Sequence, residues 1–100
     1  TLECPLMGGR LDLREALGKL YSECGISNIL IEAGPTLLGS LLDQDLINEA
    51  VVHVAPGVMG DDAAKSAASG RVCSSLDQMK RFTLGRVRRV GDDVHLHYRR

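Results

Sequence analysis

Apolar side chains recur at helical spacing between residues 12 and 25. The positions that share this spacing are Leu13, Ala16, Leu17, Leu20, Tyr21 and Cys24. Asp12 is placed to cap the start of the segment, Glu15 follows three residues later, and Gly25 is placed to end it. The pattern therefore predicts a helix that buries one face.

A strand followed by a second helix is predicted between residues 27 and 42. The run SNILIE, residues 27–32, is too short for a helix and rich in branched apolar side chains, which favours a short buried strand ending at Glu32. Pro35 suits the first turn of a helix. The apolar stripe of that helix consists of Leu37, Leu38, Leu41 and Leu42.

Residues 48–56, NEAVVHVAP, form the next apolar run, and Pro56 stops it. A run this continuous predicts a buried strand. Together with residues 27–42, it gives the order strand, helix, strand, which is typical of a parallel crossover.

The last part of the chain predicts a loop and then a hairpin. Residues 57–75 are rich in Gly, Ala, Ser and Asp without a period, so we expect a long loop with one short helical turn around residues 63–68. Residues 81–90 and 93–100 flank the dipeptide Gly91-Asp92, and the second run alternates apolar and polar side chains. This pattern predicts an antiparallel hairpin with one face toward solvent.

Length and composition indicate one small domain in a reducing compartment. The chain has 100 residues, of which 44% are hydrophobic, and it lacks an apolar stretch near the roughly 20 residues that span a bilayer. It also lacks a secretory leader, so we expect a cytoplasmic protein without a membrane partner. Its three cysteines, Cys4, Cys24 and Cys73, are odd in number and widely spaced. They are therefore expected to be free thiols.

Charge is distributed unevenly although the net charge is only -1. Residues 1–79 carry 11 acidic and 5 basic side chains, whereas residues 80–100 carry 2 acidic and 7 basic ones. A basic end can attract nucleic acid. Here the basic side chains alternate with apolar ones and lack interleaved aromatic residues, so a solvated strand face is favoured and no nucleic-acid partner is expected.

The turn after Glu32 has features of a ligand site. In an open α/β sheet, ligands lie beyond the carboxyl ends of strands, where helix N-termini present free N–H groups. Ala33 and Gly34 are small enough for a phosphate to approach the backbone, and the Thr36 hydroxyl adds a donor. Glu32 would then accept hydrogen bonds from substrate hydroxyl or amino groups. The alternative, in which Glu32 only caps the helix and Gly34 only makes the turn, stays open at this level.

Two stretches carry a family resemblance: ILIEAGPTLLGSLLDQDLINEAVVHVAPGVMGDDA, residues 29–63, and VGDDVHLHY, residues 90–98. They resemble the carboxyl-terminal half of the reductase domain of the bifunctional riboflavin-biosynthesis deaminase/reductase. The likeness extends over most of the chain, so residues 1–100 are expected to form the carboxyl-terminal portion of that domain. The resemblance implies a dihydrofolate-reductase-like α/β fold, with a sheet flanked by helices, present as a partial domain that ends in an antiparallel hairpin.

The resemblance also implies an activity and its site residues. The activity is the NADPH-dependent reduction of 5-amino-6-(5-phosphoribosylamino)uracil, a pyrimidine ribose phosphate, to its ribityl form. Carried over by position, Glu32 binds the substrate, and the cofactor phosphate segment consists of Gly34, Pro35, Thr36, Leu37, Leu38, Gly39 and Ser40. Many relatives have a second glycine where Ala33 stands, which is a mild departure because alanine is also small. No residue is assigned to catalysis, since positioning supplies most of what a protein contributes to hydride transfer.

Two functions of different classes follow. One is a part of a reductase, completed by further chain or by a second copy; the other is a non-catalytic α/β module retained for association. Both suit a homodimer, which we expect. The zinc-deaminase signatures are missing from these residues, so no deaminase activity is expected. No metal is expected either, because His95 and His97 are only two ligands on one strand face.

Overall fold

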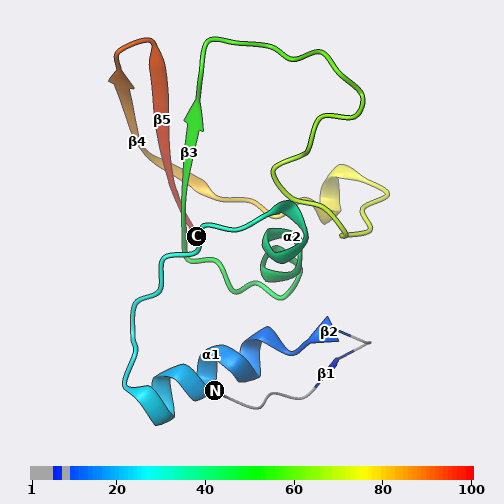
Figure 1. Ribbon diagram of the computed structural model, residues 1–100, viewed down its shortest axis with the longest axis vertical. Coiled ribbons are helices and arrows are strands. Elements are labelled where there is room, and N and C mark those ends of the chain that lie inside the picture. The colour runs from blue at the N-terminus through cyan, green and yellow to red at the C-terminus, as the bar shows by residue number, and fades with distance from the viewer. Residues whose placement is uncertain (1–5, 8–9) are drawn as a thin grey trace.

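The computed structural model describes residues 6–7 and 10–100. Its elements are β1 (Leu6–Met7), β2 (Arg10–Leu11), α1 (Leu13–Cys24), α2 (Pro35–Asp43), β3 (Glu49–Val54), the short 3-10 turn η1 (Leu76–Gln78), β4 (Thr83–Val90) and β5 (Asp93–Arg99). β1 and β2 pair as a small antiparallel ribbon that the sequence patterns did not indicate. Figure 1 shows α1 and this ribbon at one end of the molecule and the sheet of β3, β4 and β5 at the other, with α2 between them.

Helix α1 begins and ends as its sequence predicts. The Asp12 side chain accepts a hydrogen bond from the Glu15 N–H at 3.1 Å. At the other end Gly25 has a φ of 69°, and its N–H donates to the Tyr21 carbonyl at 3.0 Å. The expected buried face is formed only in part, because Leu13, Ala16, Leu17 and Leu20 are half-buried and none of the residues of α1 is fully buried. The part of the chain that the structure describes therefore covers that apolar stripe incompletely.

The strand predicted at residues 27–32 is also not formed. Residues 25–34 contain no helix or strand and connect α1 to α2, and the Leu30 residue is 84% exposed. A strand requires a neighbour that accepts and donates its ladder hydrogen bonds. No described segment takes that place beside residues 27–32, so the predicted parallel crossover to β3 is not formed either.

β3, β5 and β4 form an antiparallel sheet in that order. The hairpin of β4 and β5 confirms the prediction, and Gly91 in its turn has a φ of 61°, which favours glycine. One face carries the row of His53, His95 and Arg88, which are partners across the three strands. Their neighbours Val52, Leu96 and Val87 form a row on the opposite face. One face of the sheet is therefore polar and basic, and the other is apolar.

The loop after β3 differs from the prediction in one detail. The helical turn expected around residues 63–68 is not formed, because Asp61 instead makes a tight turn. Its side chain accepts from the Ala63 N–H at 2.8 Å, and its carbonyl accepts from the Ala64 N–H at 3.0 Å. The helical turn of this region is η1, where the Gln78 side chain accepts from the Ser74 N–H at 2.6 Å.

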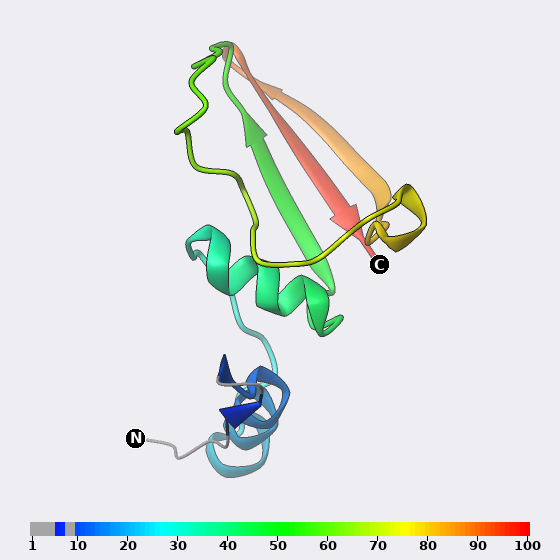
Figure 2. The ribbon, with the colours of Figure 1, turned by 90° about the vertical axis from the view of Figure 1, so that its right-hand side faces the viewer.

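The core of the described residues is small and lies at α2. Leu41 is 1% exposed and is the one fully buried large side chain among them. Many other large apolar side chains are exposed, among them Val51, Val52, Val54, Val58, Val72, Leu76, Leu84 and Val87. Figure 2 shows why: α2 lies near one end of the sheet, so most of the sheet remains uncovered. This arrangement matches the partial α/β domain that was expected.

Candidate functional site

The start of α2 is an open helix N-terminus. Gly34 is the N-cap residue, with extended backbone angles of φ -72° and ψ 174°, and no side chain makes a capping hydrogen bond. Pro35, the first helical residue, has no N–H to donate. The first intrahelical bond that closes this turn runs from the Leu38 N–H to the Gly34 carbonyl at 3.3 Å. The N–H groups of Thr36 and Leu37 therefore remain available to a ligand.

Access to this turn is unobstructed. A Cβ added to Gly34 would meet nothing within 4 Å, and Gly34, Thr36 and Leu37 are all exposed. A helix N-terminus carries partial positive charge, so an anion is stabilised there. The geometry fits a phosphate group that approaches the backbone at Gly34 and accepts hydrogen bonds from the amides that follow it.

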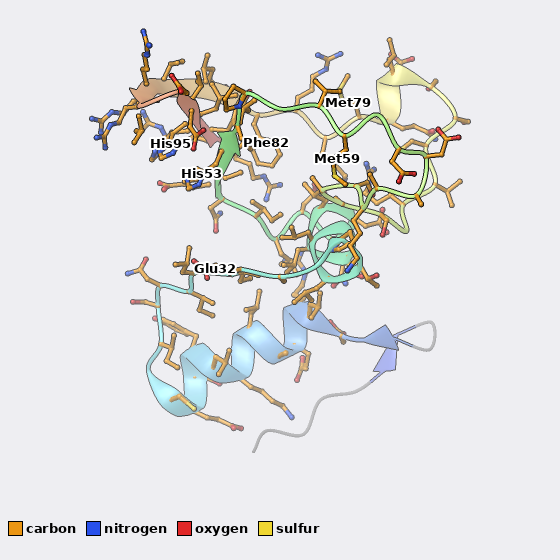
Figure 3. The ribbon with its side chains drawn as sticks, turned by 45° about the horizontal axis from the view of Figure 1, so that its top comes forward. Glu32, His53, Met59, Met79, Phe82 and His95 are labelled. Atoms are coloured by element: carbon orange, nitrogen blue, oxygen red, sulfur yellow. The ribbon has the colours of Figure 1, made fainter. Side chains whose placement is uncertain are left out.

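Glu32 precedes this turn by two residues and is exposed. Figure 3 shows it on the segment that connects α1 to α2, away from the labelled histidines of the sheet. The alternative in which Glu32 serves only as a helix cap is not supported, because α2 has no side-chain cap. The Glu32 carboxylate therefore does not cap α2 and is open to solvent beside the turn.

Gly39 differs from the other residues of the segment 34–40. It is buried, and an added Cβ would lie 1.7 Å from the carbonyl oxygen of Ser69. The glycine therefore contacts the loop after β3, whereas the first turn of α2 faces solvent. The predicted segment thus has an open part around Gly34 and a packed part at Gly39.

A charged cluster at the opposite end of α2 was not indicated by the sequence patterns. Asp45 lies 2.9 Å from the Lys80 ammonium and 3.7 Å from the Arg100 guanidinium. The hydrogen bond from Lys80 holds the pKa of Asp45 below its ordinary value, and the charges of Lys80, Arg100 and Arg71 act in the same direction. A pocket of about 130 Å³ beside this cluster is lined by Leu42, Asp45, Ile47, Lys80, Arg81, Phe82 and Arg100. The residues around Gly34 do not line it.

The histidines of the sheet also pair differently from the expectation. The rings of His53 and His95 stack across β3 and β5 with their centroids 3.9 Å apart, and Figure 3 shows them side by side. The sequence pattern places His95 together with His97 on one strand face. Facing positions on neighbouring strands depend on register, which was not predicted. Among the described residues, no group of three or more His, Cys, Asp or Glu side chains is arranged to hold a metal ion.

An open sheet, a helix whose N-terminus faces solvent and a carboxylate just before it define a partial α/β domain with a candidate anion-binding turn. The family model described as the RibD C-terminal domain matches residues 1–96. The chain belongs to this family.

Individual relatives agree with that assignment. The chain is 37% identical over 97 residues to the riboflavin biosynthesis protein RibD of Escherichia coli, with 97% of this chain and 26% of the relative covered. It is 30% identical over 86 residues to the 5-amino-6-(5-phosphoribosylamino)uracil reductase of Buchnera aphidicola, with 81% of this chain and 39% of the relative covered. The chain therefore spans well under half the length of these curated relatives.

A solved structure of Acinetobacter baumannii RibD has a similar fold. Its TM-score is 0.81 at 29% sequence identity, over 91% of this chain and 27% of that chain. The fold class expected from the resemblance is thereby confirmed as a partial α/β domain of the RibD type. Within the described residues, none of the helices is both long and apolar enough to cross a membrane.

Proposed function

We propose that this chain is part of an NADPH-dependent reductase that converts 5-amino-6-(5-phosphoribosylamino)uracil to its ribityl form in riboflavin biosynthesis. The observation that carries the proposal is the uncapped, exposed start of α2, at which an added Cβ on Gly34 would meet no atom within 4 Å. Family membership supports it, because a relative of this chain is named as that reductase.

In this proposal the segment from Gly34 to Ser40 serves the cofactor in two ways. The backbone at Gly34 and the amides of Thr36 and Leu37 bind a phosphate of NADPH, and the Thr36 hydroxyl adds a donor. The later residues of the segment hold the helix in place through packing. NADPH, when bound, supplies the hydride. This chain contributes by orienting one end of the cofactor, because a fixed approach distance supplies much of the rate of a transfer between two bound molecules.

Glu32 is proposed to bind the substrate. Its exposed carboxylate lies two residues before the phosphate-binding turn, which suits an acceptor for hydroxyl or amino groups of a pyrimidine ribose phosphate. The turn is open to solvent in the part of the chain that the structure describes, since Gly34, Thr36 and Leu37 are exposed. The site is therefore proposed to be completed by further protein, either more of the polypeptide or a second copy in a homodimer.

The exposed apolar face of the sheet supports a second candidate function. Val52, Val54 and Val87 are each at least 42% exposed, and apolar patches of this kind mark interaction surfaces. A non-catalytic association module would use that face without binding a cofactor. Both candidates place the protein in the cytoplasm, which the free, exposed thiols of Cys24 and Cys73 support.

An NADPH titration of this chain distinguishes the two functions. The reductase proposal expects saturable binding that the substitution Gly34→Asp abolishes. The association module expects a dimer or larger assembly in sedimentation without cofactor binding.

A further inference from the structure

The loop after β3 returns to α2 and contacts its first turns through Ser69 and its last residue through Arg71, whose guanidinium lies 3.2 Å from the Asp43 carboxylate. The Ser69 N–H donates a hydrogen bond to the Pro35 carbonyl at 3.0 Å, although the two residues are far apart in the sequence. Figure 2 shows the loop running down beside β3 and passing over α2. We call residues 68–70 the strap. Gly70, its last residue, has a φ of 91°, a conformation that glycine adopts without strain.

The strap lies directly on Gly39. A Cβ at this position would lie 1.7 Å from the carbonyl oxygen of Ser69 and 2.7 Å from its carbonyl carbon. Both atoms belong to the backbone, so the rotation of a side chain cannot make room. Glycine inside a helix costs about 0.5–1 kcal/mol relative to alanine. The close approach of the strap gives a physical reason for a glycine at this position.

The two contacts lie within the first turns of α2. Pro35 directly follows Gly34, the proposed phosphate-binding residue, and Gly39 lies one turn further along the helix. The strap therefore contacts the helix at both ends of one turn and joins that turn to the loop after β3. The first turn is otherwise open, since it lacks a side-chain cap.

We propose that the strap is the positioning element of the cofactor-binding start of α2, with Ser69 acting through its backbone and Gly39 as the residue that permits docking. The inference deepens the function proposed above and rests on it for the identity of the ligand. Ser69 is a positioning residue, because it contacts the Pro35 carbonyl and Gly39 and not the Thr36 and Leu37 amides that are proposed to bind the phosphate. Loss of strap docking is expected to weaken NADPH binding about tenfold or more, since small displacements of a binding group have large effects.

Two matched pairs of variants test this inference. Gly39→Ala removes the space for the strap, and Gly18→Ala makes the same change in α1, where an added Cβ would meet nothing within 4 Å. Ser69→Pro removes the N–H that donates to Pro35, and Ser69→Ala keeps it. The second pair keeps the test decisive if Gly39→Ala fails to fold, which circular dichroism would show.

Two measurements are made on the unmodified chain and on all four variants. Amide hydrogen exchange of Ser69 reports whether the strap is docked, and exchange of Leu38, whose N–H donates to the Gly34 carbonyl at 3.3 Å, reports whether the first turn of α2 responds. Calorimetric titration with NADPH reports affinity. We expect slow exchange at Ser69 in the unmodified chain and in both controls. In Gly39→Ala and Ser69→Pro, we expect faster exchange at Leu38 together with about tenfold weaker cofactor binding.

The results separate this inference from the proposed function. If the unmodified chain binds NADPH and both strap variants bind it equally well, the inference is wrong and the proposed function stands. If Ser69 exchanges rapidly in the unmodified chain, the strap is not docked and the inference is likewise wrong. If the unmodified chain does not bind NADPH but the strap variants still change exchange at Leu38, the positioning role stands and the proposed cofactor does not.

Discussion

Asp45 and Lys80 form an ion pair with the Lys80 nitrogen 2.9 Å from a carboxylate oxygen of Asp45. The contact joins the residues just after α2 to the segment before β4. The Asp45 carbonyl also accepts a hydrogen bond from the Arg100 guanidinium, and the Arg100 N–H donates to the Asn48 carbonyl at 3.0 Å. Asp45, just after α2, therefore contacts both Lys80, which precedes β4, and Arg100, which follows β5.

The pKa of Asp45 predicts how this tie responds to acid. Lys80 lowers the pKa of Asp45 in the folded chain below its ordinary value, so the stabilisation is fully present above the unfolded pKa and is lost as the pH falls through the lower folded pKa. Asp45→Asn removes the titrating group while keeping a residue type that tolerates its φ of 56°. We expect this variant to be less stable than the unmodified chain near neutral pH and to show a smaller loss of stability on acidification. Urea midpoints measured between about pH 2 and pH 7 check this.

Asp62→Asn is the control, because it removes the same charge from the loop after β3. An equally reduced acid dependence in Asp62→Asn would show that net charge, and not the contact with Lys80, produces the effect.

Leu41 should dominate the stability of the small core. Its residue is 1% exposed, so Leu41→Ala leaves a cavity and is expected to cost about 2 kcal/mol or more in the free energy of unfolding. Leu30→Ala makes the same change at a residue that is 84% exposed, and it should alter the free energy by about 0.5 kcal/mol or less. Urea denaturation of both variants provides the comparison. Equal losses would mean that Leu30 is covered in solution, for example by a second copy.

The turn between β4 and β5 should require its glycine. Gly91 has a φ of 61°, a left-handed conformation in which alanine is strained. Gly91→Ala is therefore expected to lower the free energy of unfolding by about 1 kcal/mol. Gly57→Ala is the control, since its added Cβ would meet nothing within 4 Å and its φ is outside the positive range. A control that is as destabilised as Gly91→Ala would rule out backbone strain as the cause.

The substitution Gly34→Asp should have opposite effects on stability and on ligand binding. Gly34 is an N-cap residue without a capping side chain, and aspartate at such a position accepts from the free amides and complements the helix dipole. We expect a gain of a few tenths to about 1 kcal/mol in the free energy of unfolding. Thermal denaturation measures it. Gly34→Asn should give a similar gain without the added charge, and a loss of stability in both variants would contradict the open geometry of this turn.

Local signals in the sequence predicted the elements that depend on local contacts. The cap at Asp12, the stop at Gly25 and the hairpin turn at Gly91 each involve residues close together in the chain, and each is formed. The strand at residues 27–32 depends on a neighbouring strand that the described residues do not supply. Its branched apolar side chains favour a buried strand, and the described residues alone do not provide the neighbouring strand that such a strand needs.

In the candidate site, too, the local features were predicted from the sequence and the contacts between distant residues were not. The small residues and the proline at the start of α2 indicated an open helix N-terminus, and the structure has one at Gly34. The contact of Ser69 with Gly39 and the stacking of His53 on His95 join residues distant in the sequence, so they depend on loop path and strand register. The spacing of residues along the chain predicts neither the path of a loop nor the register between strands.

Calorimetric titration of this chain with NADPH, alongside Gly34→Asp and Gly34→Asn, tests the central claim most directly. We predict saturable binding by the unmodified chain, weaker binding by Gly34→Asn, whose side chain competes for the free amides, and no binding by Gly34→Asp, because only aspartate also places a negative charge where the cofactor phosphate is proposed to lie. No binding by the unmodified chain at millimolar NADPH, or equal binding by Gly34→Asp, would contradict the claim that the start of α2 holds the cofactor.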